Sequence, residues 1–467
     1  MNNQTFTSLS FAENAGLSLK QKTALAAVGF GFLLQIAAFF GAKLPNAGLL
    51  LTISLLSIGF GTVAFAYDLY KHKPEGISNN GLWHNSLTNR GVWAWILGIV
   101  LTGFYILLYW YPEYLGQGEN SAANTGLIAF FDPLSYALKA KPASQWFVYG
   151  VLYTLLILVL GVKFIWKYRH NRYQLVRTLS VIFFQTAIAF LLPEILANFN
   201  LPFVDFKSIW PLNYYFFFDW HITEMLHNGT FGLFMLFWGI FSFVVISPVL
   251  TYFYGKRWYC SWVCGCGGLA ETAGDSFRHL SDKSLSAWKI ERYLIYGVLV
   301  FVTIMTAMVL YTRFTGATNF LFLNSEQLSK WYGMFIGAAF SGVVGVGFYP
   351  IMGSRVWCRF GCPMAGYLGI LQKYFSRFRI TTNGAQCISC GNCSSACEMG
   401  IDVKAYAQKG QDIVRASCVG CGICSAVCPR GVLRLENGSV DMDERTTQMR
   451  TIHIPETEIG ILKNFKA

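Results

Sequence analysis

The sequence predicts an all-α polytopic membrane protein with about eight transmembrane helices, followed by a small cysteine-rich α+β domain. Three observations carry this prediction. Of the 467 residues, 54% are hydrophobic and 13% are charged, whereas soluble domains carry about 25% charged residues. The hydrophobic residues form runs long enough to cross a bilayer. After about residue 376 these runs stop, and two dense cysteine blocks follow.

Eight apolar segments each approach the ~20 residues needed to cross the hydrocarbon core of a membrane. In lipid such segments must be helical, because no water is present to satisfy their backbone polar groups. We expect the helices at residues 23–42, 47–68, 91–110, 146–166, 175–197, 230–254, 291–312 and 331–352.

The distribution of lysine and arginine predicts the orientation. Lys20 and Lys22 precede the first segment, and clusters of basic residues follow the second, fourth, sixth and eighth segments. The intervening loops are poor in positive charge, so the positive-inside rule places both termini in the cytoplasm. Membrane orientation thus explains the net charge of +12, and we expect no nucleic-acid binding.

The same boundaries divide the chain into five parts. A polar cytoplasmic N-terminus covers residues 1–22, and a four-helix N-terminal membrane region covers 23–170. A four-helix membrane core with two Cys-x3-Cys motifs covers 175–376. The cysteine-rich domain covers 380–435, and a polar cytoplasmic tail covers 436–467.

Two cysteine blocks repeat one spacing. The first reads C-x2-C-x2-C-x3-C from residue 387, and the second reads C-x2-C-x2-C-x3-C-P from residue 418. Three closely spaced thiolates can hold three irons of one [4Fe–4S] cubane, while the fourth ligates the other cluster. A zinc site would close at four ligands, so eight cysteines predict a two-cluster bacterial ferredoxin-like domain. The expected ligands are Cys387, Cys390, Cys393 and Cys428 for the first cluster, and Cys418, Cys421, Cys424 and Cys397 for the second.

A second repeat lies in the membrane part. "GKRWYCSWVCGCGG" follows the sixth segment and "GSRVWCRFGCPMAG" follows the eighth, and both contain Gly-x-Arg-x-aromatic-Cys-x3-Cys. These thiols could hold an additional iron–sulfur centre or a soft metal such as Cu(I). They could also form a redox-active dithiol, or pack as buried free cysteines. The residues concerned are Cys260, Cys264, Cys266, Cys358 and Cys362.

With both repeats in view, residues 175–435 resemble the NapH/NosR/CcoG-type membrane polyferredoxins, whose core has four helices, paired C-x3-C-P motifs and a two-cluster ferredoxin domain. The resemblance implies an inner-membrane protein that passes electrons between the quinone pool or a cytoplasmic donor and an acceptor at or across the membrane. For CcoG-like members it implies copper reduction during oxidase assembly. Proline is absent here after Cys264 and after Cys397, and four additional helices precede the core.

Weaker signals lie on the expected non-cytoplasmic side. Four ionisable residues in "DWHITEMLHNG" could exchange quinol protons, because ionisable groups near a membrane often mark proton paths. An ordinary solvated loop is the alternative. They are Asp219, His221, Glu224 and His227. Glu194 is a weaker candidate of the same kind. The "TGAT" sequence suggests FMN linked to Thr318, but the usual flanking residues are absent, so FMN is not expected.

Three functions compete. The first is an iron–sulfur electron-transfer protein, an oxidoreductase-type subunit of the quinol-dehydrogenase kind. Its partners would be membrane lipid, other redox subunits, and a quinone or a cytoplasmic ferredoxin or flavodoxin. The second is a copper reductase or assembly factor that uses the membrane thiols, and the third is a redox-sensing membrane protein. The sequence shows neither a metal-rich tail nor a signalling domain, so electron transfer is the leading hypothesis.

Overall fold

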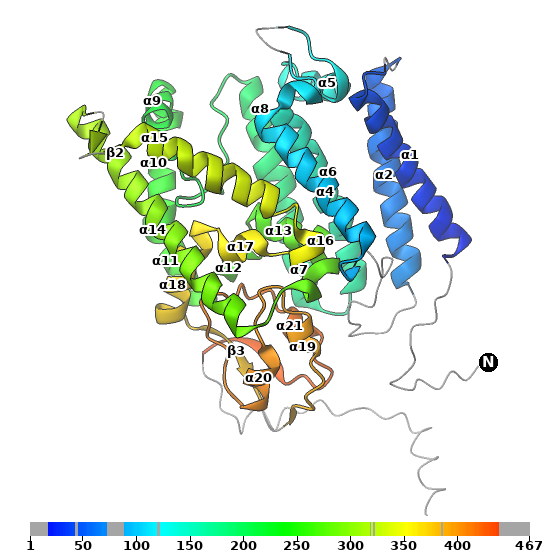
Figure 1. Cartoon of the computed structure of the whole chain (residues 1–467), viewed down its shortest axis with the longest axis vertical. Helices are drawn as coiled ribbons and strands as arrows, with labels where there is room; N and C mark the ends of the chain where they lie inside the picture. Colours follow the sequence, from blue (N-terminus) through cyan, green and yellow to red (C-terminus); the bar gives the residue numbers. More distant parts are fainter. Residues whose placement is uncertain are drawn as a thin grey trace, which may run out of the picture.

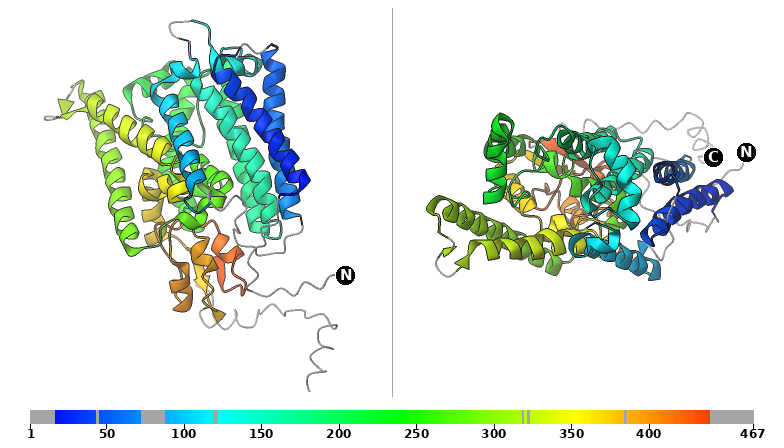
Figure 2. Two further views of the ribbon diagram at one scale, coloured as in Figure 1. Left: turned by 45° about the vertical axis from the view of Figure 1, so that its right-hand side comes forward. Right: turned by 90° about the horizontal axis from the view of Figure 1, so that it is seen from above.

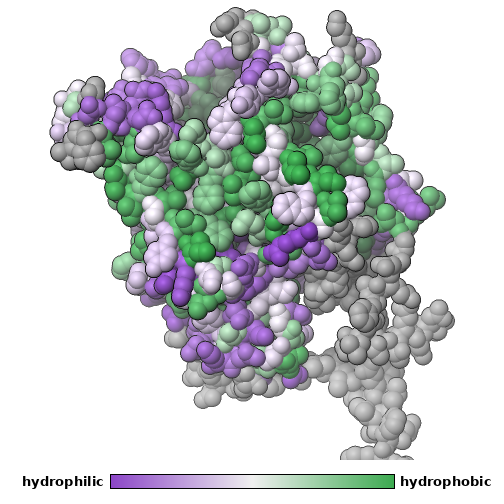
Figure 3. Space-filling model, viewed as in Figure 1, coloured by the Kyte–Doolittle hydropathy of each residue, from purple (hydrophilic) through white to green (hydrophobic). Residues whose placement is uncertain are grey.

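The computed structural model describes residues 17–42, 45–71, 88–118, 122–317, 319–320, 323–383 and 386–438. It shows a bundle of long helices with a small domain at one end (Figures 1 and 2). The side of the bundle is a broad apolar belt, whereas the small domain is mostly hydrophilic (Figure 3). Large apolar side chains such as Phe60, Ile99 and Phe237 are exposed, as a lipid-facing surface requires.

Seven helices in the described part of the chain are long and apolar enough to cross a membrane. They agree with the first seven predicted segments to within a few residues at most ends, which confirms the predicted helical membrane fold. The helices are α1 (Leu19–Phe39), α2 (Ala47–Tyr70), α4 (Val92–Trp110), α6 (Gln145–Lys167), the run from α7 to α8 (Arg172–Asn198), the run from α10 to α11 (Gly229–Tyr254), and α14 (Leu285–Thr315).

Two of these spans contain a wider helical segment with π geometry. In each case the π segment stands just before a proline, Pro193 or Pro248, whose missing N–H and bulky ring interrupt the regular ladder of hydrogen bonds. Such segments are frequent at functional sites. The first span comprises α7 (Arg172–Phe183), η2 (Phe184–Leu191) and α8 (Leu192–Asn198), and the second α10 (Gly229–Phe241), η3 (Ser242–Ile246) and α11 (Ser247–Tyr254).

The eighth predicted segment, 331–352, is not one continuous helix. The helix begins earlier, as α15 (Ser325–Trp331), continues as η5 (Tyr332–Val344) and then breaks before α16 (Tyr349–Met352). At the break, a Cβ on Gly345 would lie 2.2 Å from the Ser341 carbonyl and 2.8 Å from Trp357. The chain therefore turns into the middle of the bundle, where η5 leads towards α16 and α17 (Figure 1).

Shorter elements lie around the ends of the spans. At the end away from the small domain are η1 (Pro112–Leu115), α5 (Gly126–Lys139), α9 (Asp219–His227), β1 (Asn319–Phe320) and β2 (Leu323–Asn324). Towards the small domain are α12 (Arg257–Cys260), α13 (Gly265–Thr272), η4 (Ala273–Leu280), α17 (Val356–Phe360) and α18 (Pro363–Phe375).

The C-terminal domain is closed by two antiparallel strands. Strand β3 (Phe378–Thr382) precedes the first cysteine block and β4 (Leu433–Asn437) follows the second, in a register that pairs Phe378 with Asn437. Between them lie α19 (Asn392–Ser395), α20 (Val403–Gln408) and α21 (Ile423–Ala426). Buried side chains of the domain and of α18 belong to one continuous hydrophobic core. The domain is therefore packed onto the bundle.

Candidate functional site

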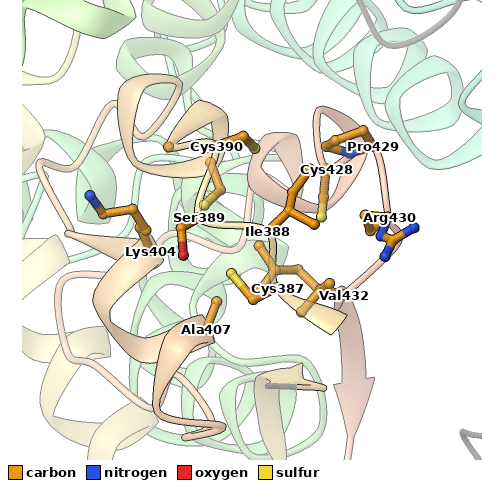
Figure 4. A pocket seen from close by; sticks show the side chains of 13 residues that line it. Cys387, Ile388, Ser389, Cys390, Lys404, Ala407, Cys428, Pro429, Arg430 and Val432 are labelled. Atoms are coloured by element: carbon orange, nitrogen blue, oxygen red, sulfur yellow. The ribbon is translucent and has the colours of Figure 1, made fainter. Parts of the chain in front are cut away.

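The predicted ligands of the first cluster surround a small cavity in the C-terminal domain, and we call these four cysteines the outer thiol set. Figure 4 shows three of them, Cys387, Cys390 and Cys428, around this cavity. Cys393 lines it as well, and its thiol interacts electrostatically with the other three. Cys390 is exposed, so this set opens to the surface.

The second predicted group, Cys397, Cys418, Cys421 and Cys424, also comes together, and we call it the inner thiol set. The thiol of Cys424 interacts electrostatically with the other three. Burial raises the pKa of the Cys418 and Cys421 thiols to about 11. The structure thus brings the last cysteine of each block to the first three of the other.

The local fold explains why both loops can receive a cluster. Gly391 and Gly422 precede α19 and α21 with positive φ angles of 80° and 74°, a conformation that glycine adopts without steric cost. Each turn directs backbone N–H groups at sulfur: Ser394 at Cys393, and Ile423 at Cys421. Hydrogen bonds of this kind help to set cluster potentials, so the residues present fit the implied cofactor.

Four membrane-part cysteines meet beneath the small domain, and we call them the bundle thiol site: Cys260, Cys264, Cys358 and Cys362. All four are buried in one core cluster. The thiol of Cys362 interacts electrostatically with the other three. The two halves are alike, since Cys260 and Cys358 lie in the short helices α12 and α17, and Cys264 and Cys362 are N-caps of α13 and α18.

The glycine of each repeat explains its Gly-x-Arg spacing. Gly255 has φ +64° and Gly353 has φ +95°, and a Cβ at either position would collide with a neighbour, Gln372 or Ser281. These turns direct the chain from the end of one helix into α12 or α17. The bundle thiol site is therefore built by two copies of the same turn.

The spacing of the bundle thiols can be compared with the spacing that three or four thiolates around a single ion require. Four thiolates around one ion with bonds of about 2.3 Å would lie about 3.8 Å apart. Among the described residues, the only three ligating groups within 4.8 Å of one another are Glu271, Glu398 and Cys421. No three thiols of the bundle site, or of either ferredoxin set, meet that spacing. None of the three sites is therefore arranged as three or four thiolates around a single ion.

Cys266 has a different role from its neighbours. Its thiol hydrogen-bonds to Cys264, and this contact is the main cause that lowers the pKa of Cys264, to about 6. The same contact raises the pKa of Cys266. Cys266 is therefore an additional thiol beside the first pair, in contact with the bundle thiol site through Cys264.

Cations surround the bundle thiol site. Arg355 directs Nη1 at Cys358 Sγ (3.6 Å) and at the Cys260 carbonyl (3.2 Å). Lys207 interacts electrostatically with Cys264. Lys207 belongs to the loop between α8 and α9, which enters the bundle from the far end: the Tyr259 hydroxyl donates to the Lys207 carbonyl at 2.8 Å. This arrangement favours a centre with net negative charge.

Glu398 anchors the inner thiol set to the bundle. It follows Cys397, at the position that Pro429 occupies in the second block. Its carboxylate is buried and pairs with Arg278 at 2.8 Å and with Arg355 at 2.9 Å. The Ser281 hydroxyl also donates to the Glu398 carbonyl at 2.7 Å.

Glu271 extends this ionic network within the bundle. It pairs with Arg355 at 2.6 Å and with Arg177. Because three guanidinium groups surround Glu271 and Glu398, the trio with Cys421 is an ion-pair network and not a cation site. Arg355 therefore touches both the bundle thiol site and the carboxylates beside Cys421.

The predicted proton-exchange residues do not form one cluster, although Glu224 interacts electrostatically with His221. His221 faces a cavity of about 20 Å³ that Asp205, Asn213 and Ser242 also line, a volume suited to one water molecule. Burial lowers the pKa of His221. Glu224 and His227 are exposed on α9. Glu194 is buried and pairs with Lys139 at 3.0 Å, Asp219 pairs with Arg313, and Thr318 lies outside the described residues.

Comparison with known families is consistent with this geometry. Residues 386–433 match the family described as "4Fe-4S dicluster domain". Residues 235–284 and 333–382, which contain the two membrane repeats, match the family described as "4Fe-4S binding domain". These are 4Fe–4S ferredoxin-type domains. They stand beside a bundle of apolar helices that are long enough to cross a membrane.

Two curated proteins are distantly similar. The "Putative electron transport protein YccM" of Escherichia coli is 25% identical over 174 residues, 36% of this chain and 47% of the relative. The "Methylamine utilization ferredoxin-type protein MauN" of Methylobacillus flagellatus is 26% identical over 156 residues, 33% of this chain and 52% of the relative. The chain thus spans about half the length of the curated relatives that it matches. No solved structure matches.

Several residues at the site were not singled out by the sequence. Lys256, Arg177, Arg278 and Arg355 read as loop charges that orient the protein in the membrane, yet all four are fully or almost fully buried. The departure Cys397-Glu398 was a usable signal, since an acidic residue replaces proline beside a cluster ligand.

Proposed function

We propose that the protein carries single electrons between a soluble carrier and the membrane through three thiol-lined redox sites. The supporting observation is the contact of the inner thiol set with the bundle. Gln174, Ser261 and Gln372 donate hydrogen bonds of 2.8 Å to the carbonyls of Cys421, Val419 and Cys418. One-electron transfer is the chemistry that bound cubanes supply. The protein's part is to hold the sites in sequence, from the exposed outer set to the buried bundle.

We place the ferredoxin domain in the cytoplasm. The helix ends nearest to it carry basic residues such as Lys71, Arg169 and Arg292, in agreement with the positive-inside rule. Lys404 and Arg430 flank the outer cavity. An acidic carrier of the ferredoxin or flavodoxin type suits such an edge, because complementary charge accelerates docking.

The bundle thiol site is, in this proposal, a third iron–sulfur site. Among the described residues, no three of its thiols lie within 4.8 Å of one another. Cationic side chains surround it, and the Ala365 N–H donates to Cys362 Sγ at 3.4 Å. The family match of both membrane repeats supports the same cofactor class. Copper handling, the second hypothesis, would need a Cu(I) ion held by thiolates of this same site, which two thiolates can do.

A groove on the lipid-facing surface suits a quinone as the membrane partner. It has a volume of about 310 Å³, within the usual range of small-molecule sites. Its lining from α4 and the α16 region is apolar, with Trp95, Ile99 and Ile351 among the lining residues. Tyr349, next to the lining residue Phe348, interacts electrostatically with Cys358. A residue adjacent in sequence to the lining is thus near enough to the bundle thiol site to interact with Cys358.

The electron-transfer proposal is tested on protein purified anaerobically. We expect about twelve iron atoms per chain for three cubanes, and EPR signals after reduction with dithionite. Cys362→Ser should remove the bundle signal and leave the ferredoxin signals. Eight irons in the wild type, with stoichiometric Cu(I) binding lost in Cys362→Ser, would instead support copper handling.

The quinone groove has its own test. Gly103 lines the groove, and a Cβ added to it would meet no atom within 4 Å, so Gly103→Leu can fill the groove without strain. We expect a quinol analogue to reduce the wild type but not Gly103→Leu, while dithionite reduces both. Gly297→Leu on the exposed face of α14 is the matched control and should behave as wild type. If a quinol analogue reduces Gly103→Leu and Gly297→Leu equally, this groove is not the quinone site.

A further inference from the structure

Lys256 carries a buried positive charge at the start of the first membrane repeat. Its side chain is 0% exposed. Within the described residues, its Nζ atom has no hydrogen-bond acceptor. Burying an unpaired ammonium is costly, and proteins normally pair such a charge or bind an anion beside it. The folded chain therefore keeps a place for negative charge next to Lys256.

The position of Lys256 indicates where that negative charge belongs. Its ammonium interacts electrostatically with Cys260 of the bundle thiol site and with Cys418 of the inner thiol set. Gln372 fixes this geometry: its Oε1 accepts from the Lys256 backbone N–H, and its Nε2 donates to the Cys418 carbonyl, both at 2.8 Å. The second repeat has Ser354 at the equivalent position, so Lys256 has no counterpart there.

We propose that Lys256 is the shared counter-charge of the two centres held by the inner thiol set and the bundle thiol site. This inference rests on the proposed electron-transfer function. Reduction adds negative charge to a cluster, and a nearby buried cation stabilises the reduced form. Lys256 therefore raises the reduction potentials of both centres and leaves the outer thiol set unaffected.

The test is a redox titration of the EPR signals in Lys256→Met, which keeps most of the apolar stem and removes the charge. We expect the reduction potentials of the inner and bundle centres to fall by about 59 mV or more, which is a tenfold change in the equilibrium constant of a one-electron reduction. The outer centre of the same molecule should keep its potential, as an internal control. Lys256→Arg, which retains the charge, should stay close to wild type.

The outcomes separate this inference from the proposed function. If the wild-type protein contains no iron, both the proposed function and the role of Lys256 are wrong. Three results would overturn the counter-charge role alone, provided that the wild type contains its clusters. In Lys256→Met, the potential could shift at one centre only, or at all three centres. Alternatively, Lys256→Arg could show the same shift as Lys256→Met. Should Lys256→Met lose iron, the same titration on Lys256→Gln decides, with the same expected shifts and the same contrary results.

Discussion

At the scale of single residues, the two cysteine blocks differ in the residue after their last cysteine. Pro429 is exposed after Cys428, whereas Glu398 is buried after Cys397 and pairs with two arginines. One block thus ends at a free surface, and the other ends in a contact with the bundle. Glu398, which stands where the second block has its proline, therefore attaches the domain to the bundle.

Glu398→Gln should destabilise this attachment. The change leaves Arg278 and Arg355 without their carboxylate, and removing one partner of a buried ion pair costs about 3–5 kcal/mol. We expect a lower melting temperature and faster proteolytic release of the C-terminal domain. Glu326→Gln, which breaks the exposed pair with Lys330, is the control and should change neither. A Glu398→Gln protein as stable as wild type would contradict the assignment.

Cluster loading should depend on pH. Burial raises the pKa of Cys393, Cys418 and Cys421 to about 11 in the metal-free chain. Below that pH these thiols are protonated, and each must release a proton to bind iron. Reconstitution with iron and sulfide should therefore strengthen from about pH 6 to pH 9 and release protons to a weak buffer. Loading that is independent of pH would disagree with these pKa values.

At the scale of elements, the two Gly-x-Arg turns carry the bundle thiol site. Each turn begins at a glycine with positive φ and ends at a short helix that bears a cysteine. The second turn also delivers Arg355 to Cys358 and Glu398. A local change at this turn should therefore affect a site several residues away.

Gly353→Ala tests this dependence. Its Cβ would lie 2.5 Å from Ser281 Oγ and 2.9 Å from Ser281 N, at a φ of +95° that alanine rarely adopts. We expect a loss of stability above about 1 kcal/mol and a weaker EPR signal from the bundle site. Gly297→Ala, in the open interior of α14, should be neutral or slightly stabilising. Equal behaviour of the two variants would show that the turn is unimportant.

At the scale of the whole molecule, the helical spans and the ferredoxin domain could be predicted because both leave local signatures: apolar runs of about 20 residues, and cysteines at fixed spacing. The ionic network could not be predicted. Its pairs join residues that are 84 and 120 positions apart, and nothing in the local sequence distinguishes a buried arginine from one that orients a loop. The eighth predicted segment, 331–352, ends later than the helix in the structure, because glycines break this helix after Val344.

The orientation of the molecule also has a direct test. An epitope inserted after Lys409, in the ferredoxin domain, should be reached by antibody only after the cells are permeabilised. One inserted after Lys141, in the loop before α6 at the opposite end, should be reached in intact spheroplasts. Both residues are exposed, so the insertions should be tolerated. The reverse pattern would invert the proposed topology.

The exposure of Cys390 has a consequence for survival in air. Oxidants attack an iron–sulfur cofactor through the ligands that solvent can reach, and Cys390 is exposed while the bundle thiols are buried. A cell that meets oxygen should therefore lose its outermost cofactor first. Repair would then need only the peripheral centre to be refilled, with the membrane-embedded part left intact.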